Sequence, residues 1–218
     1  YRVTRMDDKV MQVRLTGLQP DTTYYYRIGG FAAFGRQITK NCHNLQNGDI
    51  TLSGKWIHMS STERSINIAG VIGYKTKGAV ANCDNYGDIN IDTDITINST
   101  NTDVINAQIL NIGGVVSDSS YSTTDSDNHG NITFSGSFAG YRATVGGILG
   151  NGISNNVRPG AGAVNNGNIT FTEDAQLILS ADIFLGGCVG ITEASAVDGM
   201  TNNGNIVFKG TWMRLTRR

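Results

Sequence analysis

Aspartates are the residues of this chain whose spacing could do chemistry. Five of them are predicted to fall near one corner of the fold: Asp84, Asp88, Asp92, Asp94 and Asp103. Alternate aspartates on one strand can share a cation, and carboxylate oxygens are the ligands that Ca²⁺ prefers. A weak calcium site at Asp84, Asp88 and Asp92 is therefore one hypothesis, while solvated loop acids are the interpretation that the pattern favours.

Acid–base catalysis, as in a polysaccharide lyase, is the second chemistry that these carboxylates could perform. It would need a proton-abstracting base beside them, but the basic residues are scattered: Lys75, Lys77, Arg142 and Arg158. The histidines occupy unrelated frames without metal-ligand spacing: His43, His58 and His129. A Gly-x-Ser-x-Gly phrase is also missing. We predict a protein that is not an enzyme, has no catalytic residue and uses no cofactor.

A loop rich in hydroxyl groups is the candidate for ligand binding. Long inserts on one side of a repeat protein often form its binding face. The segment 117–127 is rich in Ser, Thr and Asp and contains Tyr121, which could stack on a sugar ring. Tyr121, Asp125 and Asp127 are the predicted ligand-binding residues, with a plain solvated loop as the alternative.

These candidates belong to a sequence that repeats. An Asn-Gly phrase recurs along the chain, and its glycines are 39, 43, 37 and 37 residues apart: Gly48, Gly87, Gly130, Gly167 and Gly204. Self-similarity at a nearly fixed period indicates that one supersecondary unit stacks on the next, because none can bury its apolar face alone. The 28 Gly, the 2 Pro and the charged fraction of 16% suit a turn-rich all-β protein.

Two strand phrases recur in each repeat. One is an aliphatic residue before a glycine pair, as in Ile112–Val115, and the other is period-two alternation, as in Ile132–Phe134. We predict an all-β fold, a parallel β-solenoid (β-helix) of about five stacked 37–43-residue coils. Because stacked strands lie about 4.8 Å apart, Ile132 should contact Ile89 and Ile169.

An asparagine precedes each Asn-Gly corner glycine at an equivalent position: Asn44, Asn85, Asn128, Asn165 and Asn202. These side chains are predicted to form an amide ladder in which each donates to the next. The glycine that follows is expected to take a positive φ, which a residue with a Cβ resists. The alternative is that the amides line a sugar or ion site.

Charge, hydropathy and cysteines exclude some classes of protein. The formal net charge of -1 argues against a nucleic-acid surface, and no apolar run of about 18 residues could span a bilayer. Cys42 and Cys83 occupy equivalent positions, whereas Cys188 lies in another column. We predict three small buried side chains, with a Cys42–Cys83 bridge between neighbouring repeats as the alternative.

A domain boundary is predicted after residue 27. Gly17 lies 37 residues before Gly54, so residues 1–27 are interpreted as the edge of a preceding coil. The alternative is the end of a fibronectin type III-like domain, whose strand corner Leu18–Tyr24 resembles. Residues 28–218 are the predicted solenoid domain. Since no cap follows the last repeat, we expect a domain truncated at its C-terminal end, within a longer protein.

A glycine-pair strand followed by an Asn-Cys-x-Asn phrase, Ala69–Tyr74 leading to Asn82–Ile89, resembles the GLUG-type repeats of bacterial surface proteins. Those proteins include adhesins of Bacteroidota, although most copies here lack the cysteine. The resemblance covers nearly the whole chain from Ile28 and implies a parallel β-solenoid exported to the cell surface.

This resemblance sets the expected function. We expect a non-enzymatic, extracellular or cell-surface repeat scaffold for adhesion or ligand presentation. Host or microbial glycans or surface proteins are its expected partners, and nucleic acid is not. The alternative is a polysaccharide-active, lyase-like β-helix enzyme or its carbohydrate-binding accessory module.

Overall fold

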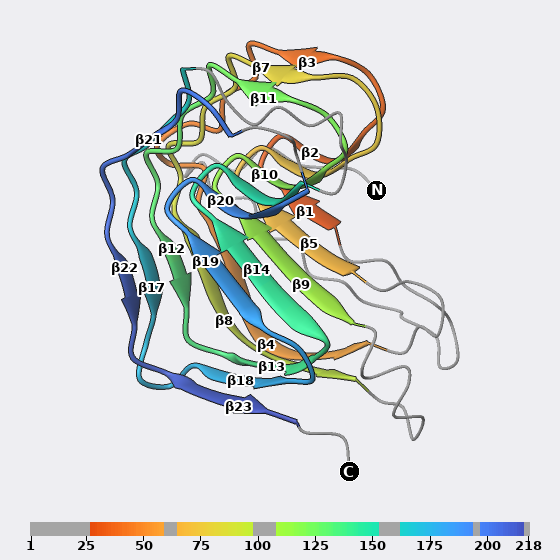
Figure 1. Ribbon diagram of the computed structural model, residues 1–218, viewed down its shortest axis with the longest axis vertical. Coiled ribbons are helices and arrows are strands. Elements are labelled where there is room, and N and C mark those ends of the chain that lie inside the picture. The colour runs from red at the N-terminus through yellow and green to blue at the C-terminus, as the bar shows by residue number, and fades with distance from the viewer. Residues whose placement is uncertain (1–26, 59–64, 98–107, 153–161, 194–196, 216–218) are drawn as a thin grey trace.

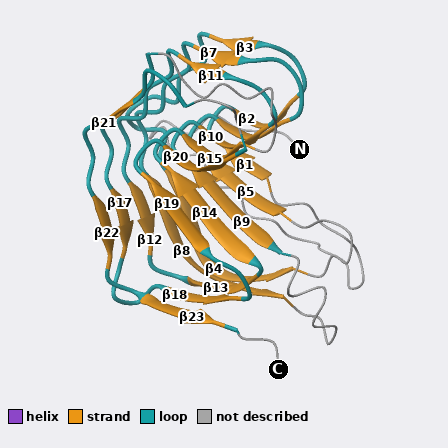
Figure 2. Ribbon diagram, viewed as in Figure 1, coloured by secondary structure: helices purple, strands orange, loops and turns teal. Residues whose placement is uncertain are grey.

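Each repeat contributes short strands to sheets that run across all repeats. A computed structural model of the chain describes residues 27–58, 65–97, 108–152, 162–193 and 197–215. Within these ranges all regular structure is β, without a helix, and the parallel strands stack as a β-solenoid (Figures 1 and 2). The predicted fold class is confirmed. The predicted five coils are slightly too many, because the solenoid makes about four turns.

Two five-stranded sheets flank the glycine pairs. The first contains the strand before each pair: β1 (Arg27–Gly29), β5 (Ser65–Ala69), β9 (Ile109–Gly113), β14 (Arg142–Gly146) and β19 (Ile183–Gly186). The second contains the strand after it: β2 (Ala32–Gly35), β6 (Ile72–Lys75), β10 (Val116–Ser119), β15 (Leu149–Gly152) and β20 (Val189–Thr192). The glycine pair is therefore the bend between these two sheets.

The chain then passes through a segment that we call the upper arm, residues 76–84 in the second repeat, to the Asn-Gly corner (top of Figure 1). Two small sheets lie there, one of β3 (Thr39–Lys40), β7 (Val80–Ala81) and β11 (Thr123–Thr124), the other of β16 (Val164–Asn165) and β21 (Thr201–Asn202). An eight-stranded sheet follows the corner. Its strands are β4 (Ile50–His58), β8 (Ile89–Ile97), β12 (Ile132–Phe134), β13 (Ser137–Gly140), β17 (Ile169–Phe171), β18 (Gln176–Leu179), β22 (Ile206–Phe208) and β23 (Thr211–Arg214).

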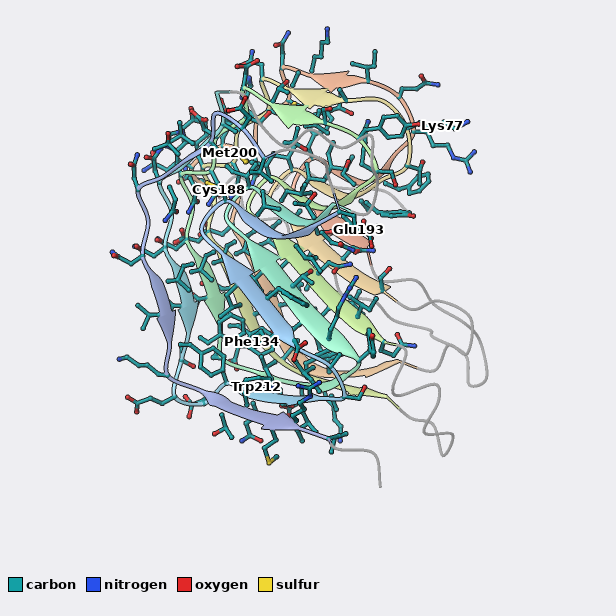
Figure 3. All side chains as sticks on the ribbon, in the orientation of Figure 1. Lys77, Phe134, Cys188, Glu193, Met200 and Trp212 are labelled. Carbon is teal, nitrogen blue, oxygen red and sulfur yellow. The ribbon has the colours of Figure 1, made fainter. Side chains whose placement is uncertain are left out.

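The register of this sheet places like residues on like. Ile132 pairs with Ile89 on one side and with Ile169 on the other, as predicted. Phe134 packs against Phe171 with ring centroids 5.3 Å apart, and both rings belong to the core. Phe134 lies inside the coil (Figure 3). Each such side chain stabilises the fold by about 1.5–3 kcal/mol when fully buried. The aliphatic and aromatic columns are therefore the main core.

A second, smaller core fills the upper arm. Val80 and Cys83 are fully buried in it, and Cys42, Cys188 and Met200 pack at its edge. Cys188 and Met200 lie together there (Figure 3). All three cysteines are free thiols, fully buried at Cys83 and half-buried at the other two. The predicted burial is complete only at Cys83.

One cation is buried beside this second core. The Lys75 side chain is fully buried, and its Nζ donates to the backbone carbonyl of Gln37 and to Thr39 Oγ1, the latter at 2.8 Å. Burial lowers the pKa of Lys75, and the nearby thiols of Cys83 and Cys42 partly oppose that shift. The sequence pattern did not indicate this lysine as a core residue.

The asparagines before the corner glycines form an amide ladder. Each Nδ2 donates to Oδ1 of the next asparagine at 2.8 Å along the series Asn44, Asn85, Asn128, Asn165 and Asn202. Each Nδ2 also donates at 2.8 Å to the carbonyl of the corner glycine in its own repeat. The predicted ladder is confirmed, and its amides are satisfied by one another.

The predicted backbone of the corner glycines is wrong. Positive φ occurs instead at the residue three before each ladder asparagine: Asn41, Asn82, Asp125, Gly162 and Gly199. These are the residue types that best tolerate the left-handed region. The corner glycines are needed for close approach, since a Cβ on Gly130 would lie 1.9 Å from the carbonyl oxygen of Gly87.

Some predictions fall outside the described residues. They include Asp103, the side chain of His58, and the two interpretations of residues 1–27, of which only residue 27 is described, as the start of β1. Both interpretations stay predictions. In the described part of the chain no helix is long and apolar enough to span a membrane.

Candidate functional site

The outer surface of the Asn-Gly corner carries a second ladder. One carboxylate or amide oxygen of each repeat accepts the backbone N–H of the next, along the series Asp49, Asp88, Asn131, Asn168 and Asn205. Asp88 Oδ1 accepts the N–H of Asn131 at 2.7 Å. The carboxylate of Asp88 therefore serves as a structural acceptor.

Asp84 belongs to a third ladder. Its Oδ1 accepts the N–H of Asp127 at 2.9 Å, and its Oδ2 lies 3.1 Å from Nδ1 of His43. Asp127 Oδ1 in turn accepts the N–H of Val164 at 2.8 Å. The structure thus joins Asp84 to Asp127, two residues that the sequence had assigned to different sites.

The three predicted metal ligands do not form one cluster. Asp84 and Asp88 lie in separate ladders. Asp92 lies further along the chain, within β8 of the eight-stranded sheet. Among the residues that the structure describes, no group of three or more His, Cys, Asp or Glu side chains could hold a metal ion. A calcium site at these positions would need ligands from elsewhere.

The predicted ligand-binding segment 117–127 begins within β10, contains β11 and ends before β12. Tyr121 is half-buried, and its backbone N–H donates to Ser119 Oγ at 3.1 Å. Asp125 has a φ of 46°, and its carboxylate lies directly beside Gly162 of the following repeat. Asp127 is a ladder acceptor. Asp127 therefore joins neighbouring repeats, and Asp125 lies against the following repeat.

A polar furrow of about 380 Å³ opens on the outer face of the eight-stranded sheet. Its lining consists of Lys55, Asp92, Asp94, Ser135, Gly136, Ser137, Asp174 and Gln176. Three carboxylates and one ammonium group line it, and none of these residues is aromatic. Such a lining suits a ligand with many hydroxyl groups better than an apolar one.

The furrow forms where successive repeats turn the same corner differently. β8 runs through the corner as one strand of nine residues, whereas the next repeat breaks at Ser135–Gly136 into β12 and β13. The repeat after that needs a longer turn, 172–175, between β17 and β18, closed by the Ala175 N–H donating to Thr172 O. Figure 1 shows the two parts of the sheet that meet at this corner: β12, β17 and β22 before it, and β13, β18 and β23 after it.

One column of side chains forms the floor of the furrow. Strand register places Lys55 next to Asp94, Asp94 next to Ser137, and Ser137 next to Gln176. Ser137 Oγ donates to Asp94 Oδ1 at 2.7 Å. Donors and acceptors thus alternate along the solenoid axis at the spacing of neighbouring strands, about 4.8 Å.

Sequence reasoning named Asp92 and Asp94 but missed their partners in the furrow. The missing signal was a fixed offset, because Lys55, Asp94 and Ser137 each follow the isoleucine after the Asn-Gly corner of their repeat by five residues. Gln176 breaks the offset, since the longer turn shifts it by two positions.

The chain matches no protein-family model, and comparisons with curated proteins and with solved structures find no match. The resemblance to GLUG-type repeats therefore stays a prediction. The residues and their geometry carry the functional argument.

Proposed function

We propose that the chain is a non-enzymatic, extracellular or cell-surface scaffold that presents its outer face to glycans. The observation that carries the proposal is the use of its loop carboxylates and amides. Asp84, Asp88 and Asp127 accept hydrogen bonds from neighbouring repeats, so they hold the solenoid together. A rigid face of regularly spaced polar side chains is well suited to display or adhesion.

The furrow is the proposed contact point for a saccharide. Asp92 and Asp94 are exposed, as are the ends of Lys55 and Gln176. Carboxylates accept hydrogen bonds from sugar hydroxyls, and the ammonium and amide groups donate to them. Because the floor is an in-register column, the backbone fixes the spacing of its side chains, and Ser137 Oγ holds the Asp94 carboxylate before any ligand arrives. This lowers the ordering cost of binding.

Glycan binding by matched variants tests the proposal. The purified chain, the double variant Asp92→Asn/Asp94→Asn and the control Asp198→Asn are applied to a glycan array, and the hits are measured by calorimetry. Asp198 is exposed and does not line the furrow. We expect the double variant to lose at least about tenfold in affinity, which is about 1.4 kcal/mol, and the control to bind as the parent does.

Two outcomes would contradict different parts of the proposal. If the double variant keeps the parent's glycan profile, the furrow is not the binding site. If the parent chain binds no glycan, glycan presentation fails, and a scaffold for protein partners would remain to be tested by the same variants.

A polysaccharide-active enzyme is the second candidate, and one observation favours it. Lys55 lies beside Asp94 in the furrow, so an amine and carboxylates share the outer face. Incubation with uronic-acid polymers, followed by detection of new reducing ends, separates the two functions. Cleavage that is lost in Lys55→Met would favour the enzyme, and no cleavage by the parent chain would favour the scaffold.

A further inference from the structure

Cys42 and Cys83 occupy the same position in neighbouring repeats. Lys40 pairs with Ala81 two residues before them, and Asn44 pairs with Asn85 two residues after them, both in parallel register. Cys42 therefore lies directly next to Cys83 across the stack. Neighbouring strands lie about 4.8 Å apart, which falls within the range of about 4.4–6.8 Å that disulfides span between Cα atoms.

The two thiols point the same way. Cys42 Sγ lies 3.4 Å from the carbonyl oxygen of Lys40, and Cys83 Sγ lies 3.3 Å from that of Ala81, its register partner. Cys83 Sγ also reaches within 3.7 Å of the Thr39 carbonyl in the first repeat. Both sulfur atoms thus lie on the inner side of the upper arm.

The backbone around the pair can adjust. β3 ends before Cys42 and β7 ends before Cys83, and each cysteine follows a residue with a positive φ, Asn41 at 55° and Asn82 at 52°. The cysteines therefore lie outside regular strands, where a small shift of the side chains toward each other does not break a ladder of strand hydrogen bonds.

The surroundings assign different roles to the two thiols. Cys42 is half-buried and accessible to a small oxidant, whereas Cys83 is fully buried. Burial raises the pKa of the Cys83 thiol. The amine of Lys75 lies close enough to interact electrostatically with both sulfurs.

We propose that Cys42 and Cys83 are a peroxide-oxidisable pair whose disulfide joins the first two repeats. The Cys42 thiolate attacks hydrogen peroxide, so an S–O bond forms, the O–O bond breaks and hydroxide leaves. The Cys83 sulfur then attacks Cys42 Sγ, so the S–S bond forms, the S–O bond breaks and a second hydroxide leaves. The two thiol protons convert both hydroxides to water, and the two thiols supply the two electrons that reduce the peroxide.

Thiol counting and peptide mapping test the pair. The folded chain is treated with a small excess of hydrogen peroxide, quenched, and unfolded for titration of free thiols. We expect the count to fall from three to one, the intact mass to fall by two hydrogen atoms, and a dithiol reductant to restore both. A non-reducing peptide map should contain a Cys42–Cys83 linked peptide. Oxidised protein should also melt at a higher temperature.

Serine variants provide the controls. Ser126 occupies the equivalent position in the next repeat, where its Oγ accepts the Cys83 N–H at 3.1 Å, so Cys83→Ser is expected to fold. Cys83→Ser should leave Cys42 as a sulfenic acid that a dimedone probe traps, without a rise in melting temperature. Cys188→Ser should form the same linked peptide as the parent chain. Three persisting thiols, overoxidation without a link, or a link that includes Cys188 would overturn the proposal.

Discussion

The side-chain amide of Asn128 lies against the backbone of Gly114, the second glycine of the pair in its own repeat. A Cβ on Gly114 would lie 2.4 Å from Cγ of Asn128. The same contact recurs in the other repeats, with corresponding distances of 2.1–2.7 Å. The glycine pair and the Asn-Gly corner, which look independent in the sequence, are thus two sides of one packing unit.

Removing one amide from the ladder should destabilise the whole stack. Asn128→Ala deletes the acceptor of the Asn85 amide and the donor to Asn165, both in buried surroundings. Unpaired buried polar groups cost about 1–3 kcal/mol each. We expect a loss of about 2–5 kcal/mol in the free energy of unfolding, measured by urea titration. The exposed control Asn203→Ala should change it by less than about 0.5 kcal/mol.

A methyl group at the corner glycine should force the repeats apart. Gly130→Ala places a Cβ 1.9 Å from the Gly87 carbonyl oxygen, so the expected cost is about 3 kcal/mol or more. Gly54→Ala is the control, because its Cβ would meet nothing within 4 Å. Its φ of 93° alone should cost about 1–2 kcal/mol. Equal losses in the two variants would show that close approach is not the reason for glycine.

The phenylalanine column should lose stability in proportion to burial. Phe171 is 1% exposed and has a ring on either side, with centroids 5.3 and 5.1 Å away. Phe171→Ala should cost about 3–5 kcal/mol. Phe208 continues the same column but is 37% exposed, so Phe208→Ala should cost half of that or less. Thermal and urea unfolding of the two variants measure the difference.

The buried lysine predicts a pH dependence with a defined sign. Because burial lowers the pKa of Lys75, the unfolded chain binds more protons than the folded one between that lowered pKa and the ordinary value of 10.5. The contribution of Lys75 to the free energy of unfolding therefore rises with pH in this window. The unfolding free energy of the parent chain minus that of Lys75→Met should therefore become more positive as the pH rises through this window.

Alkaline urea titrations check this slope. Burial raises the pKa of Cys83 and Cys188, so these thiols lower the stability as the pH rises through the unfolded value near 9.0. The effect of Cys188 is the same in both proteins and cancels in the difference. Cys83 and Cys42 interact electrostatically with Lys75, so both proteins are compared with these two cysteines replaced by Ser. A difference that stays flat with pH would mean that Lys75 keeps its ordinary pKa in the folded chain.

The fold could be predicted because the same residue types recur at equivalent positions in every repeat. Isoleucines at equivalent positions, as in Ile89, Ile132 and Ile169, and asparagines before each corner recur five times, and a repeat can satisfy them only by stacking in register. The conformation of single residues was less accessible. Asn82 and Asp125 take the left-handed backbone that was expected at the corner glycines. The corner positions need glycine for another reason, because a carbonyl of the neighbouring repeat leaves no room for a Cβ.

The candidate site was only partly predictable, for a physical reason. Neighbouring aspartates in sequence suggested a shared site, but residues four apart, such as Asp84 and Asp88, belong to different ladders. Residues about 40 positions apart, such as Lys55 and Asp94, are neighbours instead. In a stacked fold the column, and not the local sequence, decides which charges meet.

The inner amide ladder also has a direction. From Asn44 to Asn202 every Nδ2 donates toward the following repeat, and no amide is reversed. The bond dipoles therefore add along the axis, as peptide dipoles do in an α-helix, and each bond polarises the next. A column without a single formal charge thus has a negative pole at Asn44 and a positive pole at Asn202.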